Sequence, residues 1–345
     1  MGIEKTRIGI IGAGAIGCVV GGLLAKAGHD VVLADPWPEH VNLMRSSGLR
    51  LSGSCGEHLV PVTALHLGEL TQVREPFQAV FVAVKSYDTE WATQLALDHL
   101  ARDGVVVDFQ NGINDHRVAA VAGRERTLGC VILISAGMYE PAHAIRTDRG
   151  SSAFKIGEHD GRDSSRARRM AELMSAVAPA SVTTNLWGER WSKLALNCML
   201  NPLAGLSGLG TAEVRTEPVT RRLAAHLGRE VVRVAAALGH RVEPILGIDA
   251  KRFADAEDAA AIDALGRDIA ADAGSRRGGR PSMLQDVMKG RRTEIDYLNG
   301  LVPAEGRKAG LPTPFNDAVV AAFHAQPVGT LTADPRNLEP LARLL

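Results

Sequence analysis

Short apolar runs alternate with more polar segments over the first half of the chain. The runs are rich in Val, Ile and Phe, as expected for strands that are covered on both faces. They occupy residues 7–12, 29–35, 79–85, 104–111 and 127–138. The segments between them are compatible with helices. This alternation predicts a parallel β-sheet with helices between its strands.

The pattern becomes helical after about residue 185, with no further strong strand-like run. We therefore predict a boundary near residues 183–187, with an α/β domain over 1–185 and an all-helical domain over 186–345. The length of 345 residues suits two domains of ordinary size.

The first strand-like run leads into a glycine-rich turn, GAGAIG, and a predicted helix over 15–26. In a Rossmann domain, the first glycine of such a turn bends the chain tightly and the second admits a pyrophosphate. The third lets the helix pack closely on the strand. We predict that the whole turn binds a dinucleotide: Gly12, Ala13, Gly14, Ala15, Ile16 and Gly17.

Asp35 ends the second strand-like run, about twenty residues after the first glycine, as the dinucleotide fingerprint requires. A carboxylate there accepts hydrogen bonds from the ribose hydroxyls and repels a 2′-phosphate, which favours NADH over NADPH. The alternative is that Asp35 caps a turn beside Pro36, with Arg45 or Arg50 free to meet a phosphate.

A membrane helix is a second interpretation of the same region, because residues 8–25 are eighteen uncharged positions. Gly17 and Gly21 even have the spacing of small residues in packed membrane helices. Six of the eighteen residues are glycine, however, which opposes a continuous helix. We therefore predict a strand, a turn and a helix here, and no membrane partner.

Charge and cysteine content narrow the possible partners. Lys plus Arg and Asp plus Glu number 39 each, so there is no bulk electrostatic reason to expect nucleic acid or an anionic membrane as a partner. The four cysteines form no CxxC pair and have no nearby His at ligand spacing. This usage predicts neither disulfides nor a metal site. It also predicts a location in the reducing cytoplasm.

Polar residues follow two of the predicted strands. Ligands of parallel sheets gather at the carboxyl ends of the strands. Lys85 and Ser86 stand at one such end, and Gln110, Asn111 and Gly112 at another. These residues are candidates for the nicotinamide end of the cofactor; the alternative is that they are ordinary polar loop residues.

A narrow polar stripe marks the segment that begins the helical half. Lys193, Asn197 and Asn201 recur every four residues and share one helix face, while most of the remaining positions are apolar. One Lys followed by two short amides suits the wall of a polar cleft. A solvated stripe remains the alternative.

The segment RRTEIDYLNG, residues 291–300, is compatible with a helix and holds two acids, Glu294 and Asp296. Two residues apart on a helix means about 200° apart, so the acids cannot serve one site side by side. Periodicity does not choose between them. Upstream, Ser282 and Gln285 fit a capping box, which predicts a helix start at Ser282 and a possible seat for a carboxylate ligand.

These motifs resemble the ketopantoate reductases (2-dehydropantoate 2-reductases) of pantothenate biosynthesis over nearly the whole chain. The resemblance rests on five stretches in order: GAGAIG, AVKS, QNG, WSKLALNCMLNPL and SMLQDVMKGRRTEIDYLNG. It implies a Rossmann domain joined to a helical domain of the 6-phosphogluconate-dehydrogenase-like C-terminal type. It also implies reduction of the ketone of a small 2-oxo acid, ketopantoate, by NADPH.

The resemblance also implies roles for single residues. The family's catalytic lysine matches Lys193 and its partner carboxylate matches Glu294, which leaves Asp296 to the surface or to structural pairing. The cofactor-side lysine matches Lys85, and Asn111 serves both cofactor and substrate. The substrate-side amides and hydroxyl match Asn111, Asn197, Asn201 and Ser282.

Two departures from the family pattern bear on specificity. The family places an Arg after the second strand for the NADPH phosphate, where this chain has Asp35, and a further substrate-side Asn is Gly279 here. The competing hypotheses are a dehydrogenase of another hydroxy acid or an opine-like substrate, and a dinucleotide-sensing protein without turnover. A homodimer is one option for its assembly.

Overall fold

A computed structural model describes residues 5–148, 153–271, 273 and 279–345. The chain divides into two compact units, Met1–Leu186 and Trp187–Leu345. The first unit is an α/β domain and the second is helical, which confirms the predicted fold class.

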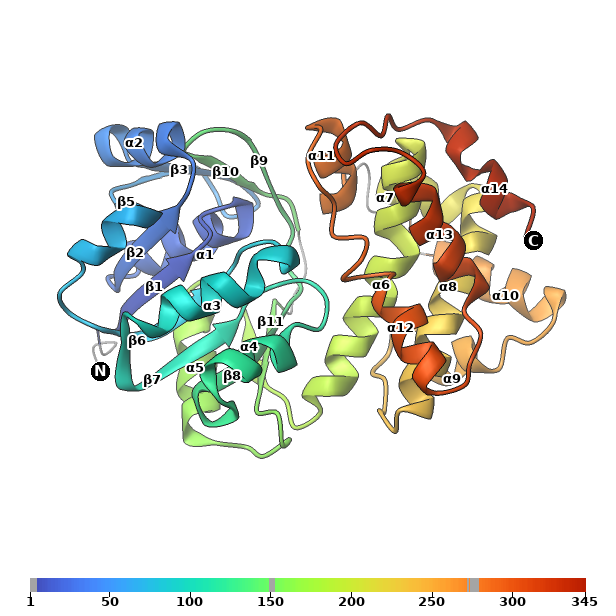
Figure 1. Cartoon of the computed structure of the whole chain (residues 1–345), viewed down its shortest axis with the longest axis horizontal. Coiled ribbons are helices and arrows are strands. Elements are labelled where there is room, and N and C mark those ends of the chain that lie inside the picture. The colour runs from blue at the N-terminus through green and yellow to red at the C-terminus, as the bar shows by residue number, and fades with distance from the viewer. Residues whose placement is uncertain (1–4, 149–152, 272, 274–278) are drawn as a thin grey trace. The chain divides into compact units, whose positions relative to one another are not determined.

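An eight-stranded sheet forms the centre of the first unit (Figure 1). All its neighbouring strands are parallel except β11 and β8. Its strands, in spatial order, are β12 (Ala180–Val182), β11 (Phe154–Gly157), β8 (Thr127–Ile132), β7 (Leu100–Asp108), β6 (Phe77–Val82), β1 (Arg7–Ile11), β2 (Asp30–Asp35) and β5 (Thr63–His66).

Both faces of this sheet are buried, as the apolar runs predict. Along β1, Ile8 and Ile10 join the core that includes α1 (Ala15–Lys26) and α5 (Ser165–Ser175). Ile11 joins the opposite core. The helices of that second core are α3 (Thr89–Leu97) and α4 (Asp115–Ala122), which lie on the same face of the sheet in Figure 1.

A second, four-stranded sheet also belongs to this unit, and the sequence patterns did not predict it. Its spatial order is β4 (His58–Val60), β3 (Leu49–Gly53), β10 (His143–Arg146) and β9 (Ala136–Glu140). The apolar run 127–138, expected as one strand, is divided between the two sheets: β8 ends at Ile132 and β9 begins at Ala136. Helix α1 contacts strands of both sheets, and α2 (Pro38–Ser47) contacts β2 and β5.

The second unit is built from helices around α8 (Pro218–Ala237), which contacts most of the others. These helices are α6 (Leu186–Ser207), α7 (Thr211–Thr216), α9 (Ala250–Ala254), α10 (Ala259–Ala270), α11 (Ser282–Met288), α12 (Leu301–Lys308), α13 (Pro314–His324) and α14 (Glu339–Ala342). Short 3-10 turns complete the described chain: η1 (Leu67–Gln72), η2 (Ser86–Asp88), η3 (Arg124–Arg126) and η5 (Pro335–Leu338). Among the described residues, no helix has the length and apolar character needed to cross a bilayer.

Candidate functional site

The glycine-rich turn has the geometry that a dinucleotide-binding turn needs. Gly12 has a φ of +101°, and a Cβ there would lie 2.8 Å from the backbone of residues 83 and 84. A Cβ on Gly17 would lie 2.2 Å from the Gly12 carbonyl oxygen, so only glycine lets α1 begin this close to β1. A Cβ on Gly14 would meet nothing within 4 Å, which leaves open the approach proposed for the pyrophosphate.

A buried histidine that sequence reasoning missed fixes this turn. The Nδ1 atom of His40 accepts a hydrogen bond from the backbone N–H of Ala142 at 2.8 Å. The ring therefore carries its proton on Nε2, which donates to the Ala13 carbonyl at 2.9 Å. Cys18 Sγ donates to the same carbonyl at 3.0 Å. His40 thus connects the cofactor turn to the turn between β9 and β10.

The environment of His40 favours its neutral form. The side chain is fully buried, and burial lowers its pKa below the ordinary value of 6.5. The Asp35 carboxylate and the bond to Ala13 oppose this shift without cancelling it. A sequence signal did exist, because His40 lies with Val41 and Met44 on the buried face of α2.

Asp35 ends β2 where the fingerprint places it, and its Oδ1 accepts the backbone N–H of Trp37 at 3.0 Å. The local turn considered as an alternative role is therefore formed. The two arginines that were candidates for a phosphate are engaged elsewhere. Arg45 pairs with Glu69 and donates to a backbone carbonyl of β5. Arg50 Nη2 lies 3.7 Å from a carboxylate oxygen of Glu57, in the connection between β3 and β4.

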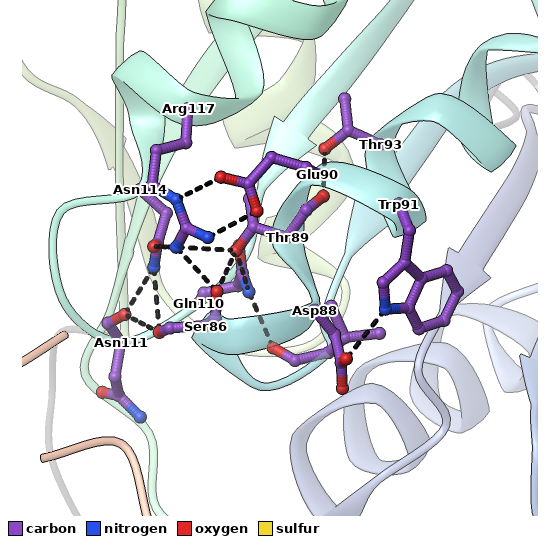
Figure 2. A network of polar contacts seen from close by, with 11 residues as sticks. Ser86, Asp88, Thr89, Glu90, Trp91, Thr93, Gln110, Asn111, Asn114 and Arg117 are labelled. Carbon is purple, nitrogen blue, oxygen red and sulfur yellow. Dashed lines mark hydrogen bonds and ion pairs between the residues drawn. The ribbon is translucent and has the colours of Figure 1, made fainter. Parts of the chain in front are cut away.

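The carboxyl ends of β6 and β7 are joined by a polar network, shown in Figure 2. Asn111 takes part through its backbone carbonyl, which accepts from Ser86 Oγ at 3.4 Å and Asn114 Nδ2 at 3.0 Å. Its side-chain amide points away from the network in Figure 2. Lys85 has extended backbone angles immediately before η2. The network therefore positions Asn111 through its backbone carbonyl, and Lys85 lies next to Ser86, which belongs to the same network.

Arg117 of α4 is the centre of this network and was also missed from the sequence. Its Nη1 donates to the Ser86 carbonyl at 2.6 Å and to Asn114 Oδ1 at 2.8 Å, and its Nε donates to Glu90 at 2.7 Å. Gln110 contributes a further bond, from Nε2 to the carbonyl of residue 84 at 2.8 Å. One guanidinium thus holds the loops that follow two neighbouring strands.

In the second unit, α6 carries the predicted polar stripe. Asn197 and Asn201 are only 5% and 8% exposed, and Lys193 is half-buried. A solvated stripe is therefore wrong for the two amides. Buried amides need hydrogen-bond partners, as the cleft interpretation supposes.

The segment 291–300 is not the helix that its composition suggested. Residues 291–293 are irregular, and a series of turns follows until α12 begins at Leu301. The backbone N–H groups of Tyr297 and Leu298 both donate to the Glu294 carbonyl at 3.0 Å. The 200° argument therefore does not apply to these two acids.

Burial separates the two acids of this segment. Glu294 is buried, with 5% of the residue exposed, whereas the Asp296 side chain is 41% exposed. Asp296 Oδ1 lies 2.7 Å from His324 Nε2, and its other oxygen lies 3.9 Å from Arg292. This agrees with a structural pairing for Asp296 and leaves Glu294 as the candidate for chemistry.

Ser282 is the first residue of α11, as predicted, but the capping box is wrong. The N-cap position is Pro281, and no side chain caps the helix. Gln285 Nε2 donates instead to the Arg280 carbonyl at 2.9 Å. The Gly279 carbonyl accepts two bonds from Thr211. Residues 274–278, which precede Gly279, lie outside the described residues.

Two family descriptions match consecutive parts of the chain. Residues 8–161 match "Ketopantoate reductase PanE/ApbA", and residues 185–326 match its C-terminal part, "Ketopantoate reductase PanE/ApbA C terminal". This chain belongs to the ketopantoate reductase family. The resemblance seen in the sequence is thereby confirmed, and the chain is an oxidoreductase that uses a nicotinamide dinucleotide. The hypothesis of a sensing protein without turnover is set aside.

Individual relatives agree with this assignment over nearly their full lengths. The 2-dehydropantoate 2-reductase of Archaeoglobus fulgidus is 29% identical, covering 90% of this chain and 94% of its own. A ketopantoate reductase from Ralstonia eutropha JMP134 has a TM-score of 0.76 at 26% identity, covering 92% of this chain and 97% of its own. D-mandelate dehydrogenase with NADH and anilino(oxo)acetate has a TM-score of 0.78 at 23% identity, with the same coverages, and is similar in fold.

Proposed function

We propose that this chain reduces the ketone of ketopantoate, with Lys193 as proton donor and Glu294 as its partner. The observation that carries the proposal is that α6 presents Lys193 on the same face as two amides, Asn197 and Asn201, that are withdrawn from water. The same unit buries the Glu294 carboxyl at 5% exposure. A lysine, a buried carboxylate and neutral amides are the residue types that ketone reduction of an anionic substrate requires.

The chemistry follows from where charge develops. The reduced nicotinamide, when bound, would supply a hydride to the ketone carbon, and negative charge would then build on the ketone oxygen. The Lys193 ammonium stabilises that charge more in the transition state than in the ground state and transfers its proton to form the hydroxyl. The lysine regains its proton from solvent. Glu294 orients the ammonium or accepts a hydrogen bond from the product hydroxyl.

The remaining predicted residues bind without competing for protons. Asn197, Asn201 and Ser282 can donate hydrogen bonds to a carboxylate while staying neutral. In the other unit, Asn111 and Lys85 lie at the carboxyl ends of parallel strands, where ligands of such sheets gather. We assign these two residues to the nicotinamide end of the cofactor, and Asn111 also to the substrate.

NADH is the cofactor that we propose. Asp35 places a carboxylate at the end of β2, where it would repel the 2′-phosphate of NADPH. Arg45 and Arg50, the nearby cations considered for that phosphate, have acidic partners elsewhere. NADH is also the cofactor named in the solved D-mandelate dehydrogenase complexes. A cytoplasmic location and a homodimer remain predictions.

Initial rates of ketopantoate reduction with NADH and with NADPH test the proposal. Lys193→Ala is expected to lower kcat on the order of 10²- to 10⁴-fold, the typical cost of losing a positioned proton donor. Lys251→Ala, which removes an exposed lysine of α9, is the matched control and should keep the wild-type rate. Equal rates in the two variants would contradict the role of Lys193.

The cofactor and substrate choices have separate readouts. The ratio of kcat/KM for NADH to that for NADPH should exceed one in the wild type and fall in Asp35→Asn, because the variant removes the charge that repels the 2′-phosphate. Gly279 stands where the family has a substrate-side Asn, so a different 2-oxo acid is the second candidate substrate. Measuring kcat/KM for a panel of 2-oxo acids, aryl ones included, decides between the candidates. If another acid is reduced with a higher kcat/KM than ketopantoate, that acid is the better candidate for the substrate.

A further inference from the structure

A proline inside α6 leaves one backbone carbonyl without its helical donor. In an α-helix the N–H of residue 202 would donate to the carbonyl of Cys198, four residues earlier. Pro202 has no N–H, and it lies within the helix. Cys198 is completely buried, and leaving a buried carbonyl without a hydrogen-bond donor is unfavourable. The helix therefore needs a donor from another part of the chain.

Asn299 supplies that donor. Its Nδ2 lies 3.2 Å from the Cys198 carbonyl oxygen and 2.9 Å from Asn316 Oδ1. The Asn299 side chain is fully buried, and its Oδ1 has no hydrogen-bond partner among the described residues. Burying an unsatisfied oxygen is unfavourable. What an amide contributes at position 299 is therefore its two N–H donors.

A chain of polar contacts that begins at Glu230 of α8 orients this amide. The Glu230 carboxylate accepts the backbone N–H groups of Phe315 and Asn316, both at 2.9 Å, at the start of α13. It also accepts Asn316 Nδ2 at 2.7 Å. An ionised carboxylate only accepts, so the Asn316 amide must present its oxygen to Asn299. The Asn299 NH₂ group then faces both acceptors, Asn316 Oδ1 and the Cys198 carbonyl.

We propose that Asn299 is a positioning residue for the reaction, because its bond to the carbonyl exposed by Pro202 fixes the turn of Glu294 against the helix of Lys193. The inference rests on the roles proposed above for Lys193 and Glu294. Within the turn, two backbone N–H groups donate to the Glu294 carbonyl, so the Glu294 backbone moves with the segment that holds Asn299. On the helix side, Cys198 directly follows the substrate amide Asn197. One hydrogen bond thus fixes the position of the turn that carries Glu294 relative to the helix that carries Lys193.

A cycle of three variants tests this: Asn299→Ala, Pro202→Ala and the double variant. Alanine at 202 restores an N–H that can donate to the Cys198 carbonyl. Asn299→Ala should therefore lower Tm less in the Pro202→Ala background than in the wild type. In the wild-type background it should also lower kcat roughly 10- to 100-fold, because small misplacements of reacting groups have effects of that size. The Kd for the dinucleotide should stay within about twofold, since the cofactor turn belongs to the other unit.

Asn337→Ala is the matched control. Asn337 Nδ2 donates to a carbonyl of the same helix, that of Leu206, at 2.9 Å, but its segment carries no proposed site residue. The control should lower Tm and leave kcat unchanged. Asn299→Ser serves if the alanine variant does not fold.

Two results would overturn the inference. One is additive Tm effects of the changes at 202 and 299; the other is a kcat of Asn299→Ala equal to that of Asn337→Ala. If the wild type reduces no 2-oxo acid, the proposed function fails, and the Tm cycle still decides whether Pro202 and Asn299 are coupled.

Discussion

The His40 contacts predict a measurable link between the fold and cofactor binding. His40→Ala removes the acceptor of the Ala142 N–H, and an unsatisfied buried donor costs about 1 to 3 kcal/mol. The cavity left by the ring adds on the order of 1 kcal/mol or more. Ala142 also has a φ of +55°, a strained conformation for a residue with a Cβ, and loses a contact that holds it. Altogether we expect the free energy of unfolding to fall by about 3 kcal/mol.

Urea unfolding and a fluorescence titration with NADH, both at pH 7.5, measure the two consequences. The Kd for NADH should rise in His40→Ala, because the Ala13 carbonyl keeps only the weak thiol donor of Cys18. His58→Ala is the control. His58 Nε2 also lies close to a backbone carbonyl, that of Cys55 at 2.9 Å, but near the surface and away from the cofactor turn. Its removal should change the free energy of unfolding by less than about 1 kcal/mol.

The pH dependence of stability gives an independent check. The pKa of His40 is lower in the folded protein than the ordinary 6.5. The contribution of His40 to the free energy of unfolding is therefore fully present above pH 6.5. It is lost as the pH falls from 6.5 toward the folded pKa, because the unfolded chain binds the proton more readily. Other histidines titrate too, so the measured quantity is the difference between the wild type and His40→Gln. A difference that grows as the pH falls would refute this account.

Two further predictions concern backbone space and buried charge. Gly17→Ala should lower Tm and abolish cofactor binding, because the added Cβ would overlap the backbone of the glycine-rich turn. Gly14→Ala should keep the wild-type Tm, because its Cβ would meet nothing within 4 Å. It should weaken only the binding of NADH, measured by fluorescence titration. Arg166→Ala should lower the free energy of unfolding by about 3 to 5 kcal/mol in urea, because it leaves the buried Glu158 carboxylate without its guanidinium. Arg168→Ala, whose guanidinium pairs at the surface, is its control.

The parts of the fold that could be predicted are those encoded by local pattern. The strand, turn and helix from 7 to 26 follow from an apolar run and from glycines at fixed spacing, and the structure has them almost residue for residue. The four-stranded sheet could not be predicted in this way. Its strands are short and of mixed polarity, such as HAIR at 143–146. The pairing of β3 with β10, which joins its two local hairpins, connects segments about ninety residues apart. The information that specifies them lies in the pairing.

The residues of the candidate site also fall into two groups: those visible in a local sequence pattern and those that depend on long-range contacts. The stripe of Lys193, Asn197 and Asn201 was visible because it repeats with the period of a helix. His40 and Asn299 were missed because they act through contacts with residues distant in the sequence: His40 with Ala13 and Ala142, and Asn299 with Cys198. Pro202, next to the stripe residue Asn201 in the same helix, was a usable signal all the same. A helix that contains proline must find a second donor, and short amides such as asparagine are natural candidates.

Glu294 and Asp296 show that the surroundings of an acid, and not its spacing in the sequence, indicate whether it can take part in a reaction. A helix would have placed them on opposite faces, but the turn imposes no such angle, and they differ instead in what surrounds them. Asp296 is partly solvated and meets His324 and Arg292, so its charge is accommodated without any ligand. Glu294 is withdrawn from water, where an ionised carboxylate is stable only with specific partners. Such burial is consistent with the role proposed above for Glu294, orienting the Lys193 ammonium, because that role uses the charge.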